Sequence, residues 1–186
     1  MRNDPRGSLD GMPTLVKDPP PAGFQALLER RRELGQDLLD EMWEGVYHMN
    51  PAPAARHAEI AQQLAVFLDA PARAAGLVPM MSIFNLGAPE DYRVPDGGLH
   101  RERPGARDVY LATAALVVEI VSPGDQTWEK LEFYAAHQVD ELLIVDPAER
   151  RVHWLGLTGE GYRPRERSGL IELGSDELAR LIDWPA

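Results

Sequence analysis

Two acidic residues and one lysine have types and spacing that could do chemistry together. Glu119 is the single carboxylate in the apolar stretch 116–121 (LVVEIV), Asp96 follows a proline, and Lys130 comes eleven residues after Glu119. Lys17 is the only other lysine, and every remaining basic residue is an arginine. A lysine presents a compact charge to one oxygen at close range, whereas arginine presents a planar fork.

Asp96 and Glu119 together have the chemistry of a magnesium site. A lone ionised carboxylate in an apolar strand is costly to bury, so Glu119 must be protonated, paired or bound to a metal. A salt bridge to an arginine would explain Glu119 equally well, and a strand-end hydrogen bond to backbone would explain Asp96. Mg²⁺ binds one or two carboxylates with waters and substrate oxygens, and the backbone carbonyl of Ile120 could add a ligand. Lys130 would then orient the attacking water or stabilise charge developing on a phosphate.

Composition limits the class of protein. The chain has 186 residues, 44% of them apolar and 26% charged, and these proportions are ordinary for one globular domain. It has no cysteine, which excludes disulfides and thiolate metal sites and fits a reducing compartment. No apolar run approaches the roughly 20 residues of a membrane span, and we expect a cytoplasmic protein. A net charge of −11 opposes passive adhesion to nucleic acid or anionic membrane, but it still allows a local basic groove.

The hydrophobic pattern predicts an α/β fold. Residues 1–22, rich in proline, are expected to form a flexible tail, and residues 23–186 a single domain. The expected helices are 24–39, 54–75, 126–137 and 175–183, the second of them ended or kinked at Pro71. The expected strands are 43–49, 78–86, 91–99, 116–121, 141–145 and 151–157, followed by a hairpin-like pair at 162–173. We therefore expect a mixed β-sheet flanked by helices.

The strand, helix and strand between residues 116 and 145 have the length of a right-handed parallel crossover, about 30 residues. Glu119 should lie about 10 Å below the end of its strand. If Asp125 caps the helix, Lys130 lies about 7 Å from the helix start, and the two side chains come to similar heights because strand and helix run antiparallel. Tyr134 shares the helix face with Lys130. Its ring could simply pack on the sheet, which is the more ordinary role, or its hydroxyl could support the lysine or guide a phosphate.

Several segments, in this order and spacing, resemble the bacterial family described as putative restriction endonucleases (Uma family), within the PD-(D/E)XK nuclease superfamily. They are residues 95–96 (PD), 118–123 (VEIVSP), 128–134 (WEKLEFY) and 140–147 (DELLIVDP), with 45–53 (GVYHMNPAP) and 56–57 (RH) upstream. The resemblance covers about residues 24–157. It implies a restriction-endonuclease-like core and Mg²⁺-dependent endonuclease activity on DNA, with Mn²⁺ as a substitute metal. It also implies that Asp96 and Glu119 are the metal ligands.

The chain departs from the superfamily pattern at the lysine. The superfamily places it two residues after the acidic residue, where this chain has Val121, so the resemblance implies that Lys130 takes its role from the following helix. The superfamily often has a supporting acid on its first core helix, which makes Glu59 a candidate and the neighbouring His57 a weaker one. For both, a solvated or helix-capping side chain is the more ordinary explanation. Glu44 is a similar and weaker candidate.

Two functions fit these observations. The first is a metal-dependent endodeoxyribonuclease, a homodimer if it cuts both strands of a duplex, since two-fold symmetry suits that task. Clusters of arginine would grip phosphates and give a steep salt dependence. There are four such clusters: the first at 30–32, the second at 101, 103 and 107, the third at 150–151, and the fourth at 163, 165 and 167. The second is a non-catalytic binding or regulatory protein on a nuclease-like scaffold, which the acidic charge and Val121 favour.

Overall fold

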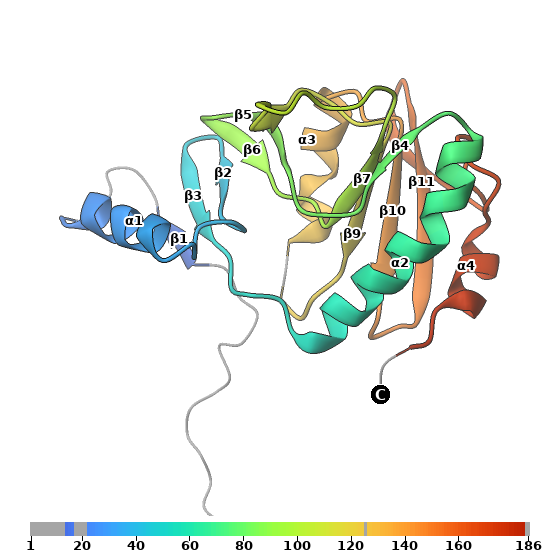
Figure 1. The fold of residues 1–186 in the computed structure, drawn as a ribbon, viewed down its shortest axis with the longest axis horizontal. Helices are drawn as coiled ribbons and strands as arrows, with labels where there is room; N and C mark the ends of the chain where they lie inside the picture. The colour runs from blue at the N-terminus through green and yellow to red at the C-terminus, as the bar shows by residue number, and fades with distance from the viewer. Residues whose placement is uncertain (1–13, 17–21, 125, 185–186) are drawn as a thin grey trace, which may run out of the picture.

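The computed structural model describes residues 14–16, 22–124 and 126–184, which form two six-stranded mixed sheets and four α-helices (Figure 1). The larger sheet has the strand order β12-β11-β10-β9-β7-β4. Its strands are β4 Val78–Met80, β7 Gly97–His100, β9 Leu116–Ile120, β10 Glu141–Asp146, β11 Arg151–Thr158 and β12 Gly161–Arg165. Only the pair β9 and β10 is parallel, and the chain between them makes the predicted crossover through η1 Thr127–Lys130 and α3 Leu131–Ala136.

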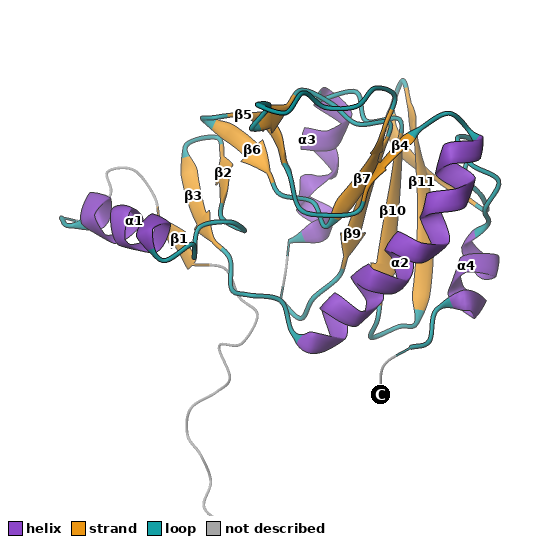
Figure 2. Ribbon diagram, viewed as in Figure 1, coloured by secondary structure: helices purple, strands orange, loops and turns teal. Residues whose placement is uncertain are grey.

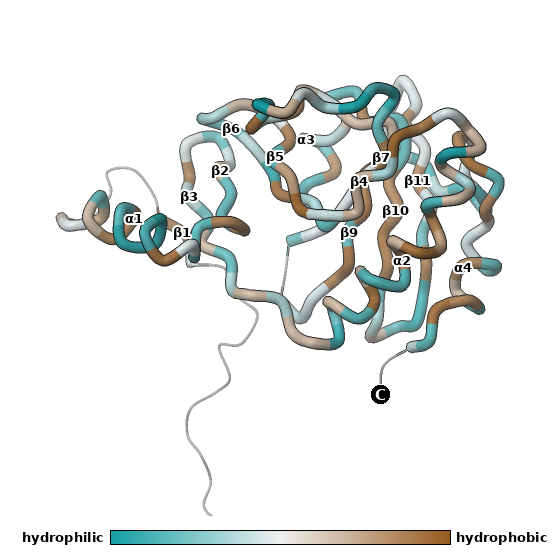
Figure 3. The backbone as a smooth tube through the Cα atoms, viewed as in Figure 1, coloured by the Kyte–Doolittle hydropathy of each residue, from teal (hydrophilic) through white to brown (hydrophobic). Residues whose placement is uncertain are grey.

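Helices cover both faces of the larger sheet (Figure 2). On one face α2 Ala55–Ala74 and α4 Ser175–Leu181 pack against inward residues such as Val118 and Ile120. On the other face α3 packs against residues such as Val117 and Ile144. Central strands that are covered on both sides need apolar residues at every position, which explains the continuous runs in β9 and β10 (Figure 3).

Helix α2 owes its position to a regular apolar stripe. Ile60, Leu64, Leu68 and Ala72 recur every fourth residue and are fully buried against the sheet. An end or a kink was expected at Pro71; the helix passes this proline and ends at Ala74, so it does not end there. None of the described helices is long and apolar enough to cross a membrane.

The smaller sheet has the strand order β1-β3-β2-β6-β5-β8 and lies beside α3 (Figure 1). Its strands are β1 Thr14–Val16, β2 Glu41–Trp43, β3 Val46–Met49, β5 Asn85–Ala88, β6 Asp91–Arg93 and β8 Tyr110–Leu111. Arg93 joins this sheet to α3, because its guanidinium lies 4.3 Å from the ring centre of Trp43 and 4.0 Å from that of Phe133. Helix α1 Phe24–Glu33 lies at the edge of the molecule and buries none of its side chains.

The segment expected as one strand at 43–49 is a hairpin of β2 and β3. Glu44 and Gly45 form its turn, with φ angles of 49° and 84°. Two positive φ angles in succession are typical of a type I′ turn, whose twist matches that of the flanking strands. Glu-Gly is not one of the dipeptides that usually mark such a turn, so the alternation of side chains concealed it.

Two other expected strands are divided between the two sheets. The segment 78–86 becomes β4 in the larger sheet and β5 in the smaller one, and the segment 91–99 becomes β6 and β7. Asp96 lies directly before β7, where its backbone N–H donates to the carbonyl of Val118 at 3.1 Å. The chain therefore passes from one sheet to the other just before the candidate metal ligand.

Other boundaries differ at the helices and the termini. Helix α1 ends at Glu33, and the helix expected at 126–137 begins with the 3₁₀ turn η1. Asp125, expected as its cap, lies outside the described residues, as do residues 1–13 and 17–21 of the expected tail. Residues 14–16 of that tail form β1, which pairs with β3. Beyond β12, the hairpin partner expected before residue 173 is replaced by a single bridge between Arg167 and Gly174.

Candidate active site

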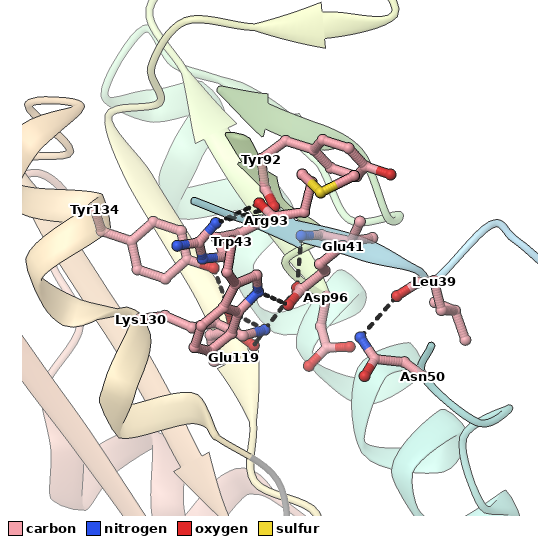
Figure 4. Close-up of polar contacts among 12 residues, drawn as sticks. Leu39, Glu41, Trp43, Asn50, Tyr92, Arg93, Asp96, Glu119, Lys130 and Tyr134 are labelled. Carbon is pink, nitrogen blue, oxygen red and sulfur yellow. Dashed lines mark hydrogen bonds and ion pairs between the residues drawn. The ribbon is translucent and has the colours of Figure 1, made fainter. Parts of the chain in front are cut away.

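Lys130 lies between two buried carboxylates that come from different sheets (Figure 4). Its Nζ is 2.9 Å from Oε1 of Glu41 on β2 and 3.2 Å from Oε1 of Glu119 on β9. The lysine side chain is 11% exposed, while those of Glu41 and Glu119 are 2% and 6% exposed. The expectation that helix and strand bring Lys130 to the height of Glu119 is therefore confirmed.

Glu41 is the residue that the sequence analysis missed. Besides Lys130 it binds the backbone N–H of Val94 at 2.8 Å and the indole N–H of Trp43 at 2.7 Å. The strand was expected to begin only at Trp43, which left Glu41 outside it. Since side chains two apart share a face of a strand, extending the strand by two residues would have placed Glu41 beside Trp43.

Glu119 is held on its other side by Tyr134. The tyrosine hydroxyl of α3 donates a hydrogen bond to Oε1 of Glu119, and Tyr134 is fully buried in the cluster under the sheet. The packing role considered for Tyr134 is thus found, while its hydroxyl contacts Glu119, a partner that the sequence analysis did not consider. The predicted orientation of Glu119 also holds, since Val117 and Val121 lie in the same cluster as Tyr134.

Burial and charge act in opposite directions on these groups. Burial raises the pKa of Glu119, and the positive charge of Lys130 opposes that change. Burial alone would lower the pKa of Lys130, but the charges of Glu119 and Glu41 outweigh it and raise that pKa. Burial and the charge of Glu119 raise the pKa of Tyr134 well above its usual value. Lys130 is therefore a cation and Tyr134 a neutral hydrogen-bond donor at neutral pH.

Asp96 stands beside Glu119 from the neighbouring strand. Strands β7 and β9 are antiparallel with Gly97 opposite Val118, so the next pair outward is Asp96 and Glu119. Oδ2 of Asp96 accepts the backbone N–H of Ile120 at 2.8 Å. This bond fixes the carboxylate at the end of β9, with its second oxygen turned toward α2.

His57, not Glu59, reaches the carboxylates from α2. Nε2 of His57 lies 2.8 Å from Oδ1 of Asp96, and Nδ1 lies 3.2 Å from Oγ of Ser122. Glu59 is exposed, and it does not border the cavity described below. Residues two apart on a helix are separated by about 200°, so the two side chains cannot share a face. Glu44 is also exposed, in the turn between β2 and β3.

One cavity joins these side chains. It has a volume of about 810 Å³ and is bordered by all five ionisable residues of the site. They are Glu41, His57, Asp96, Glu119 and Lys130. Ile120 also borders it. A ligand in this cavity would meet three carboxylates, one ammonium group and one imidazole.

Comparison with known families places the chain. The model of the Uma2 family, described as putative restriction endonuclease, matches residues 26–180. The chain belongs to the Uma2 family. This membership and the α/β architecture confirm the resemblance drawn from the sequence, and they support a nuclease.

A solved structure has the same fold as this Uma2 chain. It is the crystal structure of a putative nuclease belonging to DUF820 from Anabaena variabilis ATCC 29413. The two are similar with a TM-score of 0.60 and 16% sequence identity, over 76% of this chain and 90% of that chain. No curated protein matches the chain.

The donors of the Uma2 site suit a hard divalent cation, although the described residues contain no group of three or more His, Cys, Asp or Glu side chains placed to hold a metal. The negative charges of Asp96 and Glu41 both add to the rise in the pKa of Glu119, so carboxylates outnumber the one lysine. An added cation would relieve that repulsion. Mg²⁺ needs only one or two carboxylates and fills its other positions with water and substrate oxygens. Asp96 and Glu119 therefore fit such an ion.

Proposed function

We propose that this Uma2 chain is a Mg²⁺-dependent endonuclease that hydrolyses phosphodiester bonds in DNA. The observation that carries the proposal is the position of Lys130, held by Glu41 and Glu119 beside Asp96 in one cavity. Lys130 would supply from the following helix the charge that the superfamily's usual position, occupied here by Val121, lacks. A purely structural lysine would have no reason to border a cavity of this size.

Each residue would have a distinct part in the reaction. Asp96 and Glu119 would hold the metal, which when bound lowers the pKa of a water and neutralises charge on the phosphate. Lys130 would orient the attacking water or stabilise negative charge on the phosphate oxygens. His57 and the backbone N–H of Ile120 keep Asp96 in place. Tyr134 keeps Glu119 in place.

The first test is cleavage of DNA by the purified protein with Mg²⁺ or Mn²⁺. We expect Lys130→Ala and Glu119→Gln to lower the rate on the order of 100-fold or more, since each removes a charge at the reacting phosphate. Chelation with EDTA should abolish cleavage. The matched control is Glu160→Gln, because that carboxylate is 82% exposed and pairs with Arg163 outside the cavity.

Metal binding separates this proposal from its alternative. We expect Mn²⁺ to bind the wild-type protein in calorimetric titration and to bind Asp96→Asn weakly. If the wild-type protein neither binds Mn²⁺ nor cuts DNA, the Uma2 fold serves here as a binding or regulatory module. We propose that the protein acts in the cytoplasm. If its substrate proves to be a duplex, we also propose that it is a homodimer, and sedimentation of the protein with its substrate would test that.

A further inference from the structure

The walls of the cavity are mainly apolar. More than half of the described residues that border it have apolar side chains. They come from the segment before β2, from the loop before α2 and from α2 itself, and from the segment after β4. Examples are Leu39, Ala54, Ala58, Met81 and Ile83. The carboxylates and Lys130 share this cavity with a large apolar surface, which hydrolysis alone does not need.

Positive charge is scarce in the same cavity. Lys130 is the only lysine or arginine among the described residues that border it, and two carboxylates already hold its ammonium. A duplex is bound chiefly through many lysine and arginine contacts to its phosphates. The cavity cannot supply those contacts, so apolar burial would add to the affinity that a bound metal and Lys130 give to a phosphate.

We infer that the cavity takes one unstacked nucleotide of a single-stranded DNA segment, with the base against the apolar walls and the phosphate at the carboxylates. This inference rests on the proposed function and names its substrate class. The volume of about 810 Å³ lies in the range of roughly 300–1,000 Å³ that is typical of cavities for small organic ligands, a group to which a mononucleotide belongs.

Base stacking decides between a duplex and a single strand. A base inside a duplex is stacked and paired, so it can enter a cavity only after it is extruded, whereas a single-stranded base can enter directly. Sequence-tolerant binding of single strands characteristically combines a positively charged groove for the backbone with aromatic side chains for the bases; in this cavity a bound cation and apolar side chains would take their places. The cavity offers the apolar side chains of Leu39, Met81 and Ile83 for a base. It offers Asn50 and Ser122 as polar partners.

The substrate test compares three forms of one DNA sequence. They are the labelled strand alone, the same strand annealed to its full complement, and a duplex with a central unpaired stretch. With Mn²⁺ we expect the annealed duplex to be cut at least about tenfold more slowly than the single strand, and cleavage of the third form to map to the unpaired stretch. A duplex cut as fast as the single strand would overturn the inference.

A variant that fills the cavity tests the apolar wall. Ala58→Phe adds a ring to an exposed position on α2 that borders the cavity and is not part of the catalytic machinery. We expect it to lower kcat/KM for the single strand at least about tenfold while the affinity for Mn²⁺ stays unchanged. The control is Ala70→Phe, an exposed position on the same helix away from the cavity, which should cleave like wild type.

The two proposals fail in different ways. If the protein cuts duplex and single strand equally and Ala58→Phe has no effect, the cavity inference fails while the nuclease function stands. If no DNA is cut at all, the nuclease function fails, and anisotropy of labelled oligonucleotides then decides the inference. Preference for the single strand that is lost in Ala58→Phe would support it, and equal affinity for the duplex would overturn it.

Discussion

The ammonium group of Lys130 is oriented by ion pairs with two carboxylates, one on each side. Glu119 reaches it across the crossover, as the spacing in the sequence predicted, while Glu41 reaches it from the other sheet. The distance to Glu41, 2.9 Å, is the shorter of the two. In the proposed reaction Glu119 also holds the metal, so Glu41 would be the residue that keeps the ammonium in place. In the proposed reaction, Glu41 is a positioning residue that acts through the lysine.

This role predicts a specific effect of Glu41→Gln. The amide keeps the shape and the hydrogen bond to Val94 but removes the charge that holds the ammonium. We expect kcat to fall about 10–100-fold with KM little changed, because orientation is lost and substrate contacts are not. Steady-state kinetics on the oligonucleotide substrate measure both values. A structural role alone would lower the melting temperature and leave kcat of the folded fraction at the wild-type value, and Glu102→Gln, at an exposed position, is the control.

At the scale of elements, the hairpin of β2 and β3 completes the site. Arg93 fastens this hairpin to α3 by lying between Trp43 and Phe133 and by donating from Nη1 to the carbonyl of Met42 at 2.8 Å. This contact brings Glu41 to the same cavity as Glu119. The smaller sheet is thus part of the site itself.

Part of this arrangement of elements and site residues was predictable from the sequence. The crossover, the side chain direction of Glu119 and the reach of Lys130 follow from local periodicity and known element lengths, and all were predicted. Glu41 could not be found in that way, since its partner Lys130 is 89 residues away in the chain and only the tertiary fold joins them. The choice of His57 over Glu59 depended on the rotation of α2 about its axis, which the docking of its apolar stripe sets.

Strand β7 provides a test of stability at low pH. His100 is 5% exposed, its Nε2 has no hydrogen-bond partner among the described residues, and burial lowers its pKa below the usual 6.5. Folded His100 stays neutral while unfolded His100 takes up a proton below about pH 6.5, so the unfolded state binds more protons there. The contribution of His100 to the free energy of unfolding should therefore fall as the pH drops through that value, whereas Glu119, whose pKa is raised to about 7, contributes in the opposite direction. Burial also lowers the pKa of His48, which adds in the same direction as His100.

Denaturant titrations of wild type and His100→Leu between about pH 8 and pH 5.5 measure this effect. The variant should show a smaller decrease in unfolding free energy over that interval, with the contribution of His48 remaining. The difference between the two unfolding free energies at about pH 8, where His100 is neutral in both states, measures the change in packing and is subtracted from the differences at lower pH. Equal decreases in both proteins would show that His100 does not titrate on unfolding as described.

At the scale of the whole molecule, many of the described arginines are paired with carboxylates of the chain itself. Examples are Arg31–Asp40, Arg73–Asp69, Arg93–Asp91, Arg101–Asp140, Arg151–Glu149, Arg163–Glu160 and Arg165–Glu141. Several belong to the clusters from which the sequence suggested a grip on phosphates. With a net charge of −11, an arginine that left its partner would expose one more carboxylate to the nucleic acid. The field of the molecule as a whole therefore repels a polyanion.

Binding of single-stranded DNA should accordingly depend little on salt. Each phosphate contacted on a single strand contributes about −0.7 to the slope of log Kobs against log salt concentration. One or two contacts near Lys130 give a slope of about −0.7 to −1.4, whereas six contacts by arginine clusters would give about −4. Anisotropy titrations of a labelled strand between about 50 and 300 mM NaCl measure the slope. Arg163→Gln should leave it unchanged, because that arginine is paired with Glu160 and lies outside the cavity. A slope near −4 that becomes shallower in Arg163→Gln would mean that the arginines exchange their carboxylate partners for phosphates, and that the DNA is held outside the cavity as well as in it.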